Sequence, residues 1–376
     1  MRKILIITGR YVPGFRDGGP VRSILNLTEW LGEEYDIRIM CLDRDHGDTA
    51  PYPDIRRDEY NDVGHARVWY TEAFTPESIL RLSEDVDVVY CCGPYNDYAR
   101  IAMKLKKNGS IKAPLYIASM GSFSPEAFKI KGFKKRMFIS YMKLSGNFND
   151  IIWSVTSERE EDELKRIVGA GSRCVIATDL PRRETVRHSR TKVRGELQLV
   201  FVSRICVKKN LHAAAQILRL MDDDIRIKFD IYGTIEDREY LQKCMADLDL
   251  LKRTHPLIKW EYKGEADSSD VLNIFADHDA FLFPTLGENY GHVIEESLAA
   301  GCIPVISDTT PWMDLDEKGC GYVCSLRNAD DFVHALSELA GMDEEELSKK
   351  RNNCGTYIEM MNDKSVRDSG YRKIFG

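Results

Sequence analysis

The residues best suited to chemistry lie in one stretch, 284–301, which follows an apolar run at 280–283. The apolar run predicts a buried strand, and Gly301 is a residue at which a helix can end. A strand, a turn and then a helix bring polar groups to the carboxyl end of a parallel sheet, where ligands bind. The helix is expected to begin near Asn289, whose side chain can cap it. The backbone N–H groups that would then face an anion are those of Tyr290, Gly291, His292 and Val293.

Two glutamates flank this expected anion site: Glu288 lies in the loop before the helix, and Glu296 lies in the helix. At about 100° per residue, Glu296 falls at the edge of the apolar stripe, where its carboxylate would be partly desolvated. Glu295 falls on the opposite side, in solvent. A carboxylate accepts two hydroxyl hydrogen bonds at once, which suits the vicinal hydroxyls of a sugar. An ordinary surface helix explains these acids equally well, because the helix dipole favours acidic residues in the first turns.

Arg204 and Lys209 form a second group of charges, in a loop between an expected strand at 197–202 and an expected helix at 212–221. This loop also lies at the carboxyl edge of a sheet. An arginine fork and a lysine point charge can together neutralise a diphosphate, although a solvated basic loop has the same composition. Because these cations and a helix N-terminus already supply positive charge, no metal is expected. The acidic run at 222–224 is interpreted as a solvated turn rather than a metal-binding motif.

A glycine-containing loop at 8–20 separates an expected first strand at 3–7 from an expected helix at 21–32. Gly18 and Gly19 stand just before that helix, where backbone can approach a phosphate with no side chain between them. The loop is not a G-x-G-x-x-G motif, so a plain tight turn is the other interpretation.

Length and composition exclude several classes of protein. The 376 residues are enough for two domains, and a net charge of −7 argues against a general nucleic-acid binder. No apolar run approaches the roughly 20 residues that span a bilayer, and residues 1–7 are too short for a signal peptide. The ten cysteines include no Cys-x-x-Cys pair, so they are interpreted as reduced thiols of a cytoplasmic protein.

The segment 128–143 is basic and amphipathic, although the protein as a whole is acidic. It contains six cations and no acid, with large apolar residues between them. Such a segment suits an anionic membrane surface or a lipid that carries a pyrophosphate. A helix with one buried apolar side and one solvated basic side fits the same pattern. The cations are Lys129, Lys131, Lys134, Lys135, Arg136 and Lys143.

The spacing of Glu288, seven residues and Glu296, followed by Ser-Leu-Ala-Ala-Gly-Cys-Ile-Pro-Val-Ile, resembles the E-x7-E signature of glycosyltransferase family 4. The resemblance implies that Glu296 holds the ribose of a nucleotide-sugar and that Glu288 touches the transferred sugar. The family's Arg-x4-Lys pair, which grips the donor phosphates, is similar to Arg204 and Lys209. Its glycine-rich loop, which contacts the donor diphosphate and borders the acceptor, is similar to Gly18 and Gly19.

The sequence departs from the family pattern in three places. The loop at 119–125 lacks the histidine that contacts the donor sugar in some relatives. Near the expected linker at 182–194, where the family usually has Pro-Asn-Gly, the chain reads Thr-Asp-Leu-Pro at 178–181. Asn210 stands where many relatives have glycine, and its side chain is expected to cap the following helix.

The resemblance implies an α/β protein of the GT-B fold, in which two doubly wound Rossmann-like domains face a central cleft. Residues 1–185 are expected to form the acceptor-side domain, and residues 186–356 the domain that binds the nucleotide-sugar. The tail, 357–376, is expected to pack back on the first domain, as it does in relatives.

The resemblance also implies a reaction: a retaining, metal-independent hexosyltransferase that moves a sugar from a nucleoside-diphosphate sugar to a hydroxyl of a saccharide. We expect a UDP-sugar rather than a GDP-sugar, no further cofactor, and a polyprenyl-diphosphate-linked acceptor used in bacterial surface polysaccharide synthesis. The expected location is the cytoplasm, at the inner face of the membrane. A sugar-nucleotide epimerase of the same fold and a non-catalytic nucleotide-sugar binding protein are the alternatives.

Overall fold

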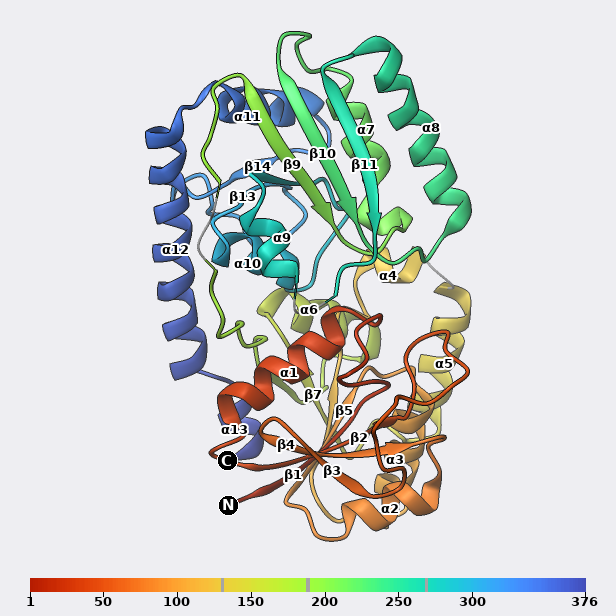
Figure 1. Ribbon diagram of the computed structural model, residues 1–376. Coiled ribbons are helices and arrows are strands. Elements are labelled where there is room, and N and C mark those ends of the chain that lie inside the picture. Colours follow the sequence, from red (N-terminus) through yellow and green to blue (C-terminus); the bar gives the residue numbers. More distant parts are fainter. Residues whose placement is uncertain (130–131, 187–189, 268–269) are drawn as a thin grey trace. The chain divides into compact units, whose positions relative to one another are not determined.

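The computed structural model describes residues 1–129, 132–186, 190–267 and 270–376. The chain divides into two compact units, each built on its own sheet (Figure 1). Unit 1 comprises Met1–Arg183 together with Lys364–Gly376, and unit 2 comprises Glu184–Asp363. The expected α/β class with two parallel-sheet domains is confirmed.

Unit 1 contains an eight-stranded sheet with the order β3-β4-β2-β1-β5-β6-β7-β8. Its strands are parallel except for β3, which pairs antiparallel with β4 at the edge. The polar segment between β2 and β4 leaves the sheet and returns to it as β3. The strands are β1 (Lys3–Ile7), β2 (Asp36–Leu42), β3 (Tyr60–Val63), β4 (Ala66–Thr71), β5 (Val88–Cys92), β6 (Leu115–Ala118), β7 (Ile151–Val155) and β8 (Cys174–Ile176).

Both faces of this sheet are covered, as the alternation along β1 shows. Leu5 and Ile7 belong to one buried cluster, and Ile4 and Ile6 belong to another, because successive strand residues face opposite sides. The near-continuous apolar run is therefore the pattern of a strand buried on both faces. The helices of unit 1 are α1 (Gly19–Leu31), α2 (Pro76–Ser83), α3 (Asp97–Lys107), α4 (Pro125–Lys129), α5 (Gly132–Leu144), α6 (Glu158–Val168) and α13 (Tyr371–Phe375).

The end of the chain belongs to unit 1 from Lys364 onward. Tyr371 and Phe375 are buried there, and their rings lie 6.1 Å and 6.2 Å from the ring of Tyr90 on β5. Tyr357, at the start of the expected tail, packs instead in the core of unit 2. The part of 357–376 that joins unit 1 therefore begins within α12 (Glu344–Arg367).

Unit 2 contains a six-stranded parallel sheet with the order β11-β10-β9-β12-β13-β14. Its strands are β9 (Glu196–Val202), β10 (Arg226–Tyr232), β11 (Ile258–Gly264), β12 (Ala280–Phe283), β13 (Ile303–Ser307) and β14 (Tyr322–Cys324). The chain continues from β9 to β10 on one side, while β12 lies on the other side of β9. This reversal is a topological switch point, beyond whose carboxyl edge open α/β sheets bind ligands.

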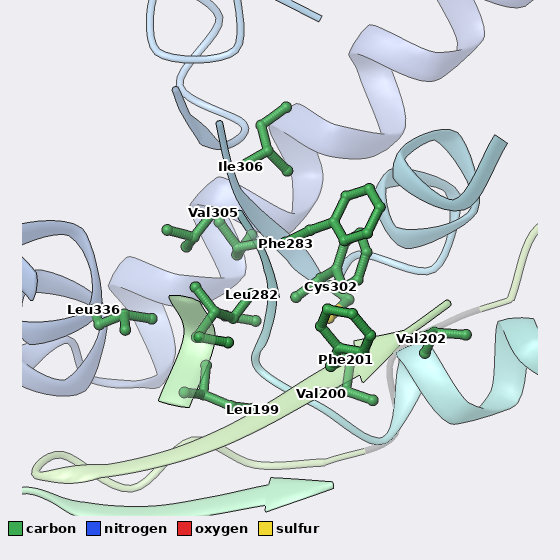
Figure 2. Close-up of a cluster of buried hydrophobic side chains, with 14 of the residues drawn as sticks. Leu199, Val200, Phe201, Val202, Leu282, Phe283, Cys302, Val305, Ile306 and Leu336 are labelled. Atoms are coloured by element: carbon green, nitrogen blue, oxygen red, sulfur yellow. The ribbon is translucent and has the colours of Figure 1, made fainter. Parts of the chain in front are cut away.

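The core of unit 2 is aliphatic and aromatic, and Figure 2 shows the part built on β9, β12 and β13. Phe283 stacks on Phe281 with ring centroids 4.9 Å apart and meets Phe201 edge-on at 5.9 Å. These rings fix the ends of β9 and β12, from which the two motif loops start. The helices of unit 2 are α7 (Leu211–Leu218), α8 (Arg238–Thr254), α9 (Val271–Ala276), α10 (His292–Ala299), α11 (Ala329–Gly341) and most of α12.

A buried ion pair ties α12 to the sheet of unit 2. The guanidinium of Arg351 lies 3.0 Å from the carboxylate of Asp279, which precedes β12, and both side chains are buried. The second carboxylate oxygen of Asp279 accepts a hydrogen bond from the backbone N–H of Gln198. The aspartate therefore links α12 to the start of β9.

Candidate functional site

The two motif loops of unit 2 lie side by side because they follow adjacent strands. The loop after β9 holds Arg204 and Lys209, and the loop after β12 holds Glu288. The backbone N–H of Leu286 donates to the carbonyl of Lys208 at 2.9 Å, and the side-chain amide of Asn210 donates to the carbonyl of Pro284 at 2.8 Å. The two loops are therefore joined by hydrogen bonds and together form one surface at the carboxyl edge of the sheet.

Lys209 and Glu288 form an ion pair within this surface. Their Nζ and Oε1 atoms lie 2.6 Å apart, and the side chains are only 12% and 10% exposed. The hydroxyl of Thr285 also lies within hydrogen-bond distance of that carboxylate oxygen, at 3.1 Å. The carboxylate is thus held in one position beside a cation, as a group that orients a substrate must be.

Two hydroxyl groups, one at the end of β13 and one in the loop that follows it, hold the loop that carries Glu288. Ser307 and Thr309 both donate to the carbonyl of Thr285, at 2.6 Å and 2.8 Å. The backbone N–H of Glu288 donates to the carbonyl of Thr309. These hydrogen bonds join the loop after β12 to β13, and the bonds from Leu286 and Asn210 join it to the loop after β9, so the position of Glu288 depends on the ends of three strands.

Lys208 is a third cation at this site, which the sequence motif did not single out. Burial lowers the pKa of its ammonium group, the charge of Glu288 opposes that effect, and the charges of Lys209 and Arg204 add to it. Lys208 therefore lies close enough to Glu288, Lys209 and Arg204 to feel their charges, and the four groups together carry more positive than negative charge. The signal that could have identified Lys208 is its place in the same short turn as Lys209, Val207–Lys209.

Arg204 lies at the exposed side of the site and pairs with Glu236, at 2.6 Å. Glu236 was not predicted, because it follows a different strand, β10. Gly233 brings the two loops together: a Cβ atom there would lie 1.7 Å from the carbonyl oxygen of Ser203. The loop after β10 can therefore pass against the loop after β9, and Ile205 donates to the carbonyl of Thr234 between them.

Helix α10 begins at His292, three residues later than expected, and Asn289 does not cap it. Gly291 precedes the helix in the left-handed conformation, with φ 87°, which glycine adopts without strain. The indole N–H of Trp312 donates to the carbonyl of Tyr290 at 2.6 Å and holds the chain in this turn. His292 and Val293 therefore supply the first N–H groups of the helix, and residues 289–290 lie in the loop before it.

The placement of Glu295 in solvent is wrong, because its side chain is only 1% exposed. Helical-wheel reasoning assumes that one side of a helix meets water, but α10 is buried over nearly its whole surface. One carboxylate oxygen of Glu295 lies 3.6 Å from Nδ1 of His292. Glu296 is also buried, one residue further along the helix.

Asn210 does not cap helix α7, contrary to expectation. Its backbone is left-handed, with φ 59°, a conformation that asparagine tolerates better than most residues. Its side chain instead bonds the Pro284 carbonyl, as described above.

The remaining predicted residues lie in unit 1. Gly18 precedes α1 and its carbonyl accepts from the N–H groups of Val21 and Arg22. A side chain added at Gly18 or Gly19 would meet no atom within 4 Å, so the backbone there is open to a ligand. The basic segment 128–143 spans the end of α4 and most of α5, with residues 130–131 outside the described part of the chain.

Two further expectations concern metals and cysteines. Within the described residues no group of His, Cys, Asp and Glu side chains has the arrangement of a metal site. The acids at 222–224 are exposed in a turn closed by a hydrogen bond from Ile225 to the carbonyl of Asp222. The ten cysteines form no disulfide.

No helix among the described residues is both long enough and apolar enough to cross a bilayer.

Comparison with known proteins shows a family match over part of the chain and a likeness in fold over all of it. Residues 182–360 match the family model described as "Glycosyl transferases group 1". This segment contains Arg204, Lys209, Glu288 and Glu296. No curated protein sequence matches the chain.

Three solved structures illustrate the likeness in fold. Anabaena HepE, in complex with UDP and glucose, has a TM-score of 0.70 at 12% identity, over 98% of this chain and 99% of that chain. Sucrose-phosphate synthase from Thermosynechococcus elongatus has a TM-score of 0.69 at 13% identity, over 100% and 99%. The UDP-forming α,α-trehalose-phosphate synthase from Burkholderia xenovorans, in complex with glucose-6-phosphate, has a TM-score of 0.68 at 11% identity, over 100% of both chains. The expected GT-B fold is confirmed.

Proposed function

We propose that this chain, whose residues 182–360 match the model of the glycosyl transferases group 1, moves a hexose from a UDP-sugar to a hydroxyl of a saccharide acceptor. The observation that carries the proposal is the largely buried ion pair of Lys209 and Glu288, with Lys208 and Arg204 near it, at the carboxyl edge of β9 and β12. The choice of UDP is supported by the solved relatives, one of which holds UDP and another of which is UDP-forming.

The costly event in sugar transfer is departure of the nucleoside diphosphate, because negative charge builds up on its phosphate oxygens. Fixed cations stabilise that charge without reorganising. Arg204 can bind two phosphate oxygens with its planar fork, and the two lysines act as point charges. Three cations and the first N–H groups of α10 supply the positive charge that the leaving group requires, so we propose a metal-independent reaction.

Glu288 and Glu296 would hold the two sugars of the donor. Glu296 lies in α10, and we propose that it accepts hydrogen bonds from the ribose hydroxyls. Glu288, whose carboxylate is fixed by Lys209 and Thr285, would orient the transferred sugar rather than attack it. Without a protein nucleophile, attack by the acceptor on the face from which the diphosphate leaves would give retention of configuration.

For the acceptor we propose a saccharide linked to polyprenyl diphosphate, used at the cytoplasmic face of the membrane in bacterial surface polysaccharide synthesis. The support is the basic and apolar segment 128–143 in a chain of net charge −7. Gly18 and Gly19 leave open backbone in unit 1, which we propose to contact the donor diphosphate beside the acceptor.

The experiment that tests this function is a thermal-shift screen of UDP-, GDP- and ADP-sugars, followed by transfer assays with the best donor. A ligand that binds only the folded state raises the unfolding midpoint by mass action, so a UDP-sugar should raise it most. Transfer should then be faster to a polyprenyl-diphosphate-linked saccharide than to the same saccharide without lipid. Conversion of the donor to an epimer, or binding with no turnover on any acceptor, would contradict the proposal.

A further inference from the structure

Helix α5 has a second apolar face that the core of unit 1 does not use. Ile139 and Met142 are buried and belong to one of the two hydrophobic clusters of unit 1. On another side of the same helix, large apolar side chains are exposed to solvent. These residues, which we call the apolar stripe, are Phe133 (77% exposed), Met137 (59%), Tyr141 (66%) and Leu144 (90%).

The spacing of the apolar stripe makes it a continuous line along the helix. Its members are separated by four, four and three residues, which places them within an arc of about 80° on a helix of 3.6 residues per turn. Other exposed large apolar residues in the described chain are spread over separate elements, such as Leu220, Met313 and Met360. Scattered apolar residues are ordinary on protein surfaces, whereas a contiguous line of them marks a site of interaction.

Cations stand on both edges of the apolar stripe. On the helical wheel Lys134 borders one edge, while Arg136 and Lys143 lie beyond the other, and all three side chains are exposed. Lys143 reaches the carbonyl of Ile167 at 3.2 Å. Long basic side chains at such edges can extend their charged ends to lipid headgroups while the stripe is covered.

The cations of the basic segment 128–143 differ in whether they face solvent or the protein. The ammonium group of Lys135 donates to the carbonyl of Ala127 at 2.6 Å and lies 5.4 Å from the centre of the Tyr95 ring, so it is turned toward the protein. Lys131 and the side chain of Lys129 fall outside the described residues. Lys143 is exposed but, like Lys135, donates to a backbone carbonyl, so the exposed charge of α5 is best tested at Lys134 and Arg136.

We propose that the apolar stripe of α5 inserts into the headgroup region of an anionic membrane, with the helix lying in the plane of the surface. An apolar centre with cations on both edges is the charge pattern of an interfacial helix. Tyr141 is of a residue type enriched at membrane interfaces, and phenylalanine and leucine, as at Phe133 and Leu144, are common on the apolar face of interfacial helices. Because the chain carries a net charge of −7, an anionic bilayer does not attract it as a whole, and docking then depends on a local basic and apolar face such as α5.

The proposed function explains only why docking would be useful: it would hold unit 1 at the membrane surface that carries a lipid-linked acceptor. The contact itself needs no donor and no turnover. It can therefore be tested separately from the chemistry.

The test is partition of the full chain onto vesicles of phosphatidylcholine, with and without phosphatidylglycerol, at low and high salt. Reversing two charges with K134E/R136E should weaken binding to anionic vesicles by about 30-fold or more at low salt, since each cation contributes roughly fivefold. Its control is K104E/K112E, which makes the same charge change at exposed lysines of unit 1 and should bind like the wild type.

Shortening the stripe with F133S/L144S should weaken binding by about 30-fold at both salt concentrations, because the apolar contribution is not screened. Its control is Leu220→Ser, at an exposed leucine of unit 2, which should change nothing. All four substituted positions in α5 are exposed, so the variants should unfold at the wild-type midpoint.

Three results would overturn the docking. The wild type could bind anionic vesicles no better than neutral ones, or the α5 variants could bind as well as their controls. Light scattering could instead show a dimer that F133S/L144S dissociates, with no vesicle binding, which would assign the stripe to self-association. Transfer to an acceptor without lipid, measured in parallel, should be equal in all variants. If the wild type transfers no sugar to the acceptor without lipid, that result would count against the proposed function and not against docking.

Discussion

Replacing Lys209 with alanine removes the ammonium group that lies 2.6 Å from the carboxylate of Glu288. Removing one partner of a fully buried pair costs about 3–5 kcal/mol, because the other charge stays buried without compensation. The two side chains are 12% and 10% exposed, so water reaches the remaining carboxylate in part. We therefore expect a loss of about 2 kcal/mol in the free energy of unfolding. For a unit of this size that lowers the unfolding midpoint by about 4–8 °C.

The same substitution removes one of the cations that stabilise the departing diphosphate. Loss of one such group typically costs about 10²–10³-fold in turnover. The assay is release of nucleoside diphosphate from the donor in the presence of acceptor, measured below the unfolding midpoint of the variant. A matched control is Lys243→Ala, at an exposed lysine of α8 in the same unit, which should turn over like the wild type.

The double variant K209A/E288Q separates stability from catalysis. It removes the uncompensated carboxylate, so it should regain most of the stability lost by Lys209→Ala, but none of the turnover. Turnover within about threefold of the wild type in folded Lys209→Ala would remove this lysine from the phosphate site. Equal losses in Lys243→Ala would show that the effect is not local.

Three other substitutions test separate parts of the structure. Glu296→Gln should weaken UDP binding by about tenfold, which is the scale of a hydrogen bond to a charged group. Glu295→Gln should lower the unfolding midpoint and leave the affinity for UDP unchanged. Equal losses of affinity in calorimetric titrations of the two variants would contradict the assignment of Glu296 to the ribose. Arg351→Met leaves a buried carboxylate unpaired and should cost about 3–5 kcal/mol in urea unfolding, and a loss below about 1 kcal/mol would mean that the pair does not anchor α12. Burial would raise the pKa of Asp230, but hydrogen bonds and charges from His278 and a neighbouring lysine outweigh it and lower that pKa. The ionised form therefore stabilises the fold above the unfolded pKa of about 4, and this contribution is lost as pH falls through the folded pKa. Asp230→Asn should make the unfolding midpoint less dependent on pH below about 4, and an unchanged pH profile would refute the pairing.

The apolar runs predicted the architecture well, because a parallel sheet covered on both faces requires continuous apolar strands. The runs at 197–202 and 280–283 became β9 and β12, and these neighbours bring the two charged loops together. The ion pair of Lys209 and Glu288 therefore follows from the order of strands, which short-range patterns do not encode.

Features that depend on contacts between distant residues could not be predicted. Helix α10 begins at His292 because Trp312, twenty residues later, bonds the carbonyl of Tyr290. Glu295 is buried because other elements cover both sides of α10, which a helical wheel cannot show. Glu236 reaches Arg204 through the close approach of loops at Gly233.

The most direct test of the proposed reaction is a mass balance for a single incubation of donor, acceptor and enzyme. Mass spectrometry should show the acceptor heavier by one hexose, and chromatography should show one UDP released for each hexose transferred. NMR of the product should show the anomeric configuration of the donor. Consumption of the UDP-sugar with no change in acceptor mass, or no consumption with any acceptor, would contradict the assignment of this chain as a sugar transferase.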